Sequence, residues 1–94
     1  MKTKNQLFSL DILIGNWESV NLNPTIIIYK NNNAYMLSVI YINETTRQAH
    51  PATYEIQKDK GGYYIVCNSK RIIVNYDARL DSLNLTSFGD YIRN

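Results

Sequence analysis

The sequence has 94 residues, the size of one domain, so we assign residues 1–94 to a single unit with no room for a second. Hydrophobic residues make up 45% of the chain and include eight tyrosines, which favours a packed core and excludes a disordered segment. Ten basic and eight acidic residues leave a net charge of +2, scattered along the chain. That field is too weak to indicate nucleic acid or an anionic membrane as a partner.

Cysteine and histidine each occur once, as Cys67 and His50. This excludes an internal disulfide and any His/Cys metal cluster, so we expect no metal and no cofactor. Asp11 interrupts the apolar run near the N-terminus, and no small-residue cleavage site follows, which argues against a signal peptide. No stretch approaches the roughly 18 apolar residues of a membrane span, so we expect a cytoplasmic protein.

Near the N-terminus, Leu7, Leu10 and Ile14 stand at helical spacings in and just after residues 5–13. They predict a short N-terminal helix that covers an end or an edge of a sheet. Short runs rich in Ile, Val, Tyr and Leu then recur about every ten residues, separated by Asn, Asp and Gly. The seven runs span residues 16–21, 25–30, 34–43, 52–58, 62–68, 71–77 and 82–87, and residues 91–93 are an eighth candidate.

This rhythm predicts an up-and-down antiparallel meander of seven or eight strands that curls into a small barrel, closed or partly open. The longest connection is residues 44–51, and we expect it to end at Pro51, which cannot donate to a sheet ladder. Alternation of side chains along the strands predicts the inward-facing residues. They are Trp17, Ile26, Ile28, Tyr35, Leu37, Val39, Tyr54, Ile56, Tyr63, Ile65, Ile72, Val74, Leu83 and Leu85.

The second and third runs differ from the others because they are apolar on both faces. A two-residue turn at Asn31 and Asn32 would pair Ile28 with Tyr35, and a three-residue turn would change the pairing; the sequence leaves both open. An apolar outer face needs a lid or a partner. We therefore predict a protein partner or a homodimer on this face, through Ile27, Tyr29, Met36, Ile40 and Ile42.

A glycine and a tryptophan two positions apart, Gly15 and Trp17, stand at the start of the first strand, after a short helical stretch and before the meander. Arg93 follows "FGDYI" near the end of the chain. In these features the sequence resembles the lipocalin-like, or calycin, class of small barrels, and it is similar to small uncharacterised bacterial proteins of that type. The resemblance implies that Trp17 plugs the closed end of the barrel beneath the Arg93 guanidinium. It implies no established activity.

Residues with catalytic chemistry do not form a recognisable pair in the sequence. His50 lies in the long loop, Cys67 shares the inward alternation of Tyr63 and Ile65, and Asp77 and Asp81 flank a tight turn. We therefore expect a non-enzyme whose main role is protein interaction or self-association.

Two other functions remain open. The first is binding of a small apolar or carboxylate-bearing ligand inside the barrel, although the bulk of the inward side chains favours a filled core. Its polar tips would be Tyr35, Tyr54, Tyr63, Tyr91 and Arg93. The second, and the least favoured, is single-stranded nucleic acid binding through exposed tyrosines near Lys58, Lys60, Lys70 and Arg71.

Overall fold

Nine antiparallel strands follow one short 3-10 helix in the computed structural model, which describes residues 8–94. Their order in the sheet is β4-β3-β2-β1-β9-β8-β7-β6-β5, so strands that follow one another in the chain are neighbours in the sheet, except β4 and β5, and β9 pairs with β1. The all-β meander predicted from the sequence is confirmed. The elements are η1 (Leu10–Leu13), β1 (Gly15–Ser19), β2 (Thr25–Asn31), β3 (Ala34–Ile42), β4 (Ala49–Glu55), β5 (Gln57–Asp59), β6 (Gly62–Cys67), β7 (Lys70–Asp77), β8 (Ser82–Leu85) and β9 (Gly89–Arg93).

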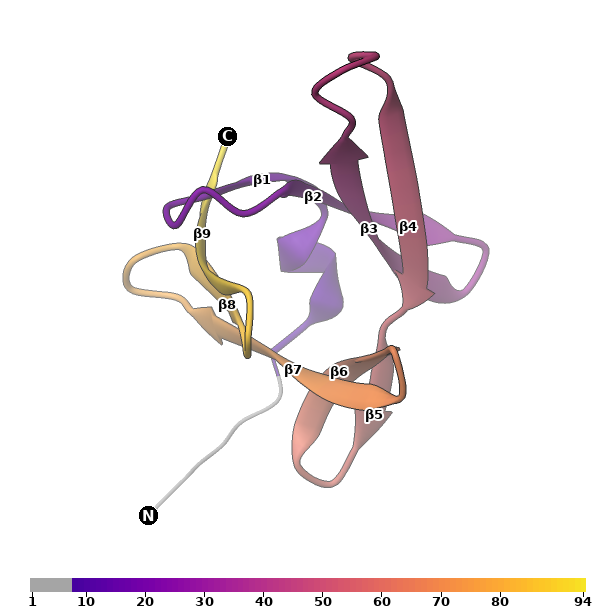
Figure 1. Ribbon diagram of the computed structural model, residues 1–94. Coiled ribbons are helices and arrows are strands. Elements are labelled where there is room, and N and C mark those ends of the chain that lie inside the picture. The colour runs from indigo at the N-terminus through magenta and orange to yellow at the C-terminus, as the bar shows by residue number, and fades with distance from the viewer. Residues whose placement is uncertain (1–7) are drawn as a thin grey trace.

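The barrel nearly closes because one continuous segment, residues 49–59, forms the strands at both ends of the sheet (Figure 1). Strands β4 and β5, the two end strands, are separated only by Ile56, whose side chain is buried and whose N–H donates to the Tyr35 carbonyl at 2.8 Å. The run predicted at residues 52–58 therefore bends at Ile56, pairing first with β3 and then with β6. This bend explains why nine strands are found where seven or eight were expected.

The β2–β3 hairpin turns at Asn32 and Asn33, one residue later than the two-residue turn considered from the sequence. Asn32 has a φ of 59°, a left-handed conformation that asparagine tolerates. Ile28 consequently pairs with Leu37 and not with Tyr35. Because the register differs by two residues, each side chain keeps its predicted face.

The sequence predicted that the long loop ends at Pro51. This is wrong, because Pro51 lies inside β4. Hydrogen bonds from Asn43 N–H to the Gln48 carbonyl and from Ile56 N–H to the Tyr35 carbonyl show which pairs of the β3–β4 ladder are hydrogen-bonded. By alternation, the nitrogen of Pro51 faces the unpaired edge of β4, where a missing donor breaks no ladder bond. A proline at this position also discourages another strand from adding to the edge.

The barrel interior is filled by side chains from every long strand and from η1. All inward-facing residues predicted from the sequence are buried or, for Tyr35 and Tyr54, packed against the buried core. The cluster also includes Cys67, whose inward alternation the sequence indicated, and Leu10, Leu13 and Tyr91, with Phe8, Tyr76 and Phe88 packed against it.

The predicted N-terminal helix is only one 3-10 turn, Leu10–Leu13, and residues 5–7 of the predicted helix lie outside the described residues. Ser9 caps it by accepting from the Asp11 N–H at 3.3 Å. The turn lies in the middle of the ring of strands in Figure 1, with Leu10 and Leu13 buried. No helix among residues 8–94 has the length and apolar character needed to cross a membrane.

Candidate functional site

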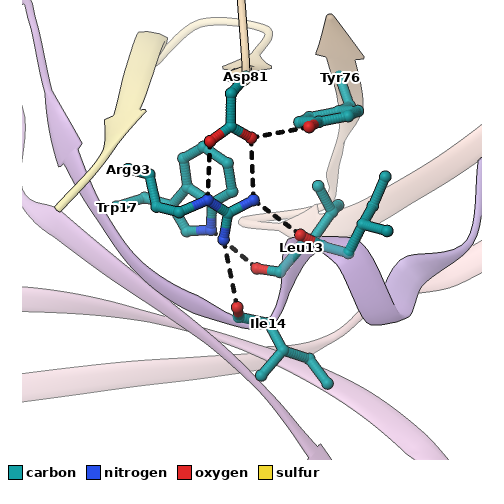
Figure 2. Close-up of polar contacts among 7 residues, drawn as sticks. Leu13, Ile14, Trp17, Tyr76, Asp81 and Arg93 are labelled. Atoms are coloured by element: carbon teal, nitrogen blue, oxygen red, sulfur yellow. Dashed lines mark hydrogen bonds and ion pairs between the residues drawn. The ribbon is translucent and has the colours of Figure 1, made fainter. Parts of the chain in front are cut away.

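The structure brings the predicted plug residues Trp17 and Arg93 together at the barrel mouth that η1 occupies (Figure 2). The third predicted plug residue, Gly15, lies beside the Arg93 guanidinium. Trp17 is fully buried, and its indole N–H donates to the Leu13 carbonyl at 2.8 Å. The Arg93 guanidinium carbon lies 4.3 Å from the centroid of the indole ring, which is the geometry of a cation–π contact. The indole therefore joins η1 on one side to β9 on the other.

The Arg93 guanidinium uses both of its edges. One edge makes a two-point contact with Asp81, through Nε to Oδ2 at 2.9 Å and Nη2 to Oδ1 at 3.0 Å. The other contacts are with the carbonyls of Ile12, at 2.7 Å, and Ile14, at 3.3 Å. Gly15 leaves room for this group, because an added Cβ would lie 3.3 Å from Arg93 Nη1 on a backbone with φ of 143°.

Asp81 was not predicted as a member of this cluster. Hydrogen bonds from Arg93 and then from Tyr76, whose hydroxyl donates at 2.7 Å, lower the pKa of Asp81 from its ordinary 3.8 to about 2. The carboxylate thus stays charged in the folded protein at acidities that protonate it in the unfolded chain.

Three of the four tyrosines proposed as ligand contacts form hydrogen bonds with other residues of the described chain. Tyr35 donates to Asp11 Oδ1 at 2.5 Å and Tyr63 donates to the Phe8 carbonyl at 2.8 Å, so both hold the N-terminal segment in the barrel mouth. Tyr54 accepts from the Cys67 thiol at 3.4 Å. Within residues 8–94, the hydroxyls of these three tyrosines are therefore already bonded to other parts of the protein.

Tyr91 is the exception among the predicted ligand contacts. It is fully buried, and its hydroxyl has no hydrogen-bond partner within the described part of the chain. Burial is the main cause that raises its pKa to about 12, so the hydroxyl keeps its proton at neutral pH. An unpaired buried hydroxyl costs roughly 1–3 kcal/mol. Among residues 8–94, the Tyr91 hydroxyl is the one buried side-chain oxygen or nitrogen without a hydrogen-bond partner.

The predicted interface residues share the outer face of β2 and β3, where they form an apolar strip. Strip residues Tyr29 and Ile42 are exposed, the latter by 54%. The remaining three, Ile27, Met36 and Ile40, are half-buried by their neighbours. The described part of the N-terminal segment packs in the barrel mouth, away from this strip.

Leu22, which the sequence analysis did not single out, extends the strip at one end. It is 98% exposed and has a left-handed backbone with φ of 64°. Hydrogen bonds of the neighbouring residues fix the loop and leave Leu22 pointing outward. The hydropathy of "VNLNP" alone does not show which residue of the loop is exposed.

Two shallow grooves lie on the outer surface of the barrel. The first, of about 340 Å³, runs between the β1–β2 loop and the end of β3, where Leu22, Pro24, Ile40 and Ile42 supply its apolar lining. The second, of about 400 Å³, lies over β7, β8 and β9, where Tyr76 and Leu80 lie among polar residues such as Asn75 and Asn84, and most of its lining surface is apolar.

The residues with catalytic chemistry are found in separate places. Asp77 accepts from the backbone N–H groups of Arg79 and Leu80 in the β7–β8 turn, while Asp81 is held by Arg93. Cys67 is buried in the core and His50 is exposed on β4. No group of three or more His, Cys, Asp or Glu residues is placed to hold a metal ion within residues 8–94.

A nearly closed antiparallel barrel, filled by its own side chains and stoppered by its own N-terminal turn, places the protein in the class of small all-β meander domains. The chain belongs to the family described as "Domain of unknown function, B. Theta Gene description (DUF3876)", whose model matches residues 2–93. Neither a curated protein nor a solved structure shows significant similarity to it. The resemblance to lipocalins is therefore supported at the level of the barrel, and not by membership of a lipocalin family.

The lowered pKa of Asp81 predicts an acid-sensitive plug. A carboxyl group whose pKa is lower in the folded state stabilises the fold above its ordinary pKa of 3.8, and this contribution is lost as the pH falls toward about 2. We expect Asp81→Asn to lower the melting temperature at neutral pH, and the difference from the wild type to shrink as the pH falls through that window. Thermal unfolding followed by Trp17 fluorescence measures both.

Asp77→Asn is the matched control, since it removes a nearby carboxylate that does not bond to Arg93. A pH-independent difference between the wild type and Asp81→Asn would show that the Arg93–Asp81 pair does not stabilise the plug.

Proposed function

We propose that this domain is a non-enzymatic protein-interaction module that binds through the apolar strip of β2 and β3 together with Leu22. The observation that carries the proposal is the state of Leu22. A left-handed backbone costs a branched residue roughly 1–2 kcal/mol, and a side chain that is 98% exposed regains none of this by burial within the domain. Hydrogen bonds of the neighbouring asparagines hold this backbone, but a leucine at the position gains nothing within the domain, which supports a role in binding.

Hydrogen bonds fix the residues on either side of Leu22, so its side chain projects from an ordered loop. Ser19 Oγ accepts from the N–H groups of Asn21 and Asn23 at 2.9 and 3.0 Å. Asn21 Oδ1 accepts from the Asp90 N–H at 3.0 Å, and the Asn23 amide donates to the Phe88 carbonyl. A contact residue that is ordered before binding loses less entropy when a partner arrives.

Leu22→Asn tests whether Leu22 serves binding or folding. Asparagine tolerates a left-handed backbone and the leucine side chain makes little contact, so the variant should be more stable than the wild type by up to about 1 kcal/mol. Chemical denaturation at low protein concentration, followed by Trp17 fluorescence, measures the free energy of unfolding. A loss of stability would mean that Leu22 supports the fold, and the proposal would fail.

Leu80→Asn is the matched control. Leu80 is also a turn leucine, 70% exposed, but its φ is not positive. Its replacement should change the free energy of unfolding by less than about 0.5 kcal/mol, which separates the backbone effect at position 22 from the effect of removing any exposed leucine.

The unpaired hydroxyl of Tyr91 favours a second candidate function, the lipocalin-type binding of a small carboxylate-bearing ligand in the barrel. A protonated phenol is a donor suited to a carboxylate. The packed interior opposes this candidate, because a ligand would have to displace core side chains or the N-terminal turn.

Titration with a medium-chain fatty acid tests this second candidate. If the interior binds it, Trp17 fluorescence should change saturably in the wild type, and Tyr91→Phe should weaken the binding at least about tenfold through the lost hydrogen bond. A flat titration of the wild type would eliminate the candidate.

A further inference from the structure

The groove beside Leu22 exists because β3 is longer than its neighbour. Strand β2 begins at Thr25, which pairs with Ile40, whereas β3 continues to Ile42 and on to the projecting tip of the β3–β4 hairpin (Figure 1). By ladder alternation, the backbone groups of Ile42 face the side on which β2 is missing. The first groove lies in this gap. Ile40 and Ile42 contribute to the apolar part of its lining, and Asn23, Thr25 and Glu44 form the polar part.

A protruding leucine thus stands directly beside a groove on the same face, whose lining is partly apolar and partly polar. Leu22 is both the most exposed of the large hydrophobic residues among residues 8–94 and part of the lining of the groove. A two-fold axis near this wall makes such a surface complementary to itself, since the projection of each copy meets the concavity of the other. An unrelated partner would not need this side-by-side arrangement.

We propose that the occupant of the groove is a second copy of this chain, with Leu22 of each copy seated between Pro24 and Ile42 of the other. The inference rests on the proposed function and specifies its partner. The remainder of the apolar strip would continue the contact from the groove along β2 and β3.

The charges near the groove are compatible with such a pair. The loop that would enter, residues 20–24, carries no charged residue, so Glu44 at the rim meets amide side chains and not another carboxylate. The net charge of +2 gives two copies little long-range repulsion.

Pairing through the unpaired edge of β4 is a less suitable route to a dimer. Pro51 lacks one of the N–H donors of that edge, and Glu55 at the end of β4 would bring a carboxylate from each copy into the contact. A contact through the face that contains Leu22 does not depend on the donor that Pro51 lacks and does not bring two carboxylates together.

Sedimentation equilibrium of the full chain, from micromolar to millimolar concentration, tests the inference. The wild type should dimerise reversibly, and Leu22→Asn should weaken dimerisation about 100-fold or more because each dimer loses two buried leucines. Ile42→Thr, which removes part of the groove floor and keeps a β-branched residue, should also weaken it. Trp17 fluorescence checks that each variant is folded.

Leu80→Asn and Val66→Thr are the controls, because both remove exposed apolar surface elsewhere on the barrel. They should dimerise as the wild type does. A wild type that stays monomeric throughout, or a dimer that Leu22→Asn leaves unchanged, would overturn the inference. If the wild type is monomeric and Leu22→Asn is nonetheless the more stable protein, the interaction module remains and its partner is a different protein.

Discussion

The burial of one indole ring is the constraint on which the rest of this barrel depends. The indole N–H of Trp17 donates to the carbonyl of Leu13, the last residue of η1, and the ring lies under the Arg93 guanidinium. The ring also meets that of Tyr76 edge-on, with centroids 6.4 Å apart. These contacts join the first strand, the last strand and the N-terminal turn at a single point. Asp81 then neutralises the guanidinium, so a charged group can remain at the edge of an apolar core.

A plugged and filled barrel directs attention to its outer surface. The polar tips that a ligand cavity would need, such as Tyr35 and Tyr63, are spent on holding the N-terminal segment. The outer face of β2 and β3 instead keeps apolar side chains that the domain leaves exposed or half-buried, and Leu22 is held in an unfavourable conformation at its end. Residues that stabilise the fold and residues available for binding are therefore on opposite sides of the same strands.

Alternation was sufficient to predict the core and the outer strip, because a strand places successive side chains on opposite faces whatever its partners are. The bend at Ile56 was not predictable in this way, since it depends on which strand each half of the segment pairs with. The resemblance to lipocalins linked Trp17 to Arg93, 76 positions along the chain, but not to Asp81, whose turn position explained it equally well. Leu22 was missed because its orientation is set by hydrogen bonds to a distant turn.

Hydrogen exchange of the Trp17 indole N–H, followed by NMR, tests the central claim most directly. If the indole stoppers the barrel, this proton should exchange only when the whole domain unfolds, and the free energy of its exchange should equal the free energy of global unfolding. Rapid exchange under native conditions, while the strand amides stay protected, would show that the mouth opens without the barrel and would contradict the account.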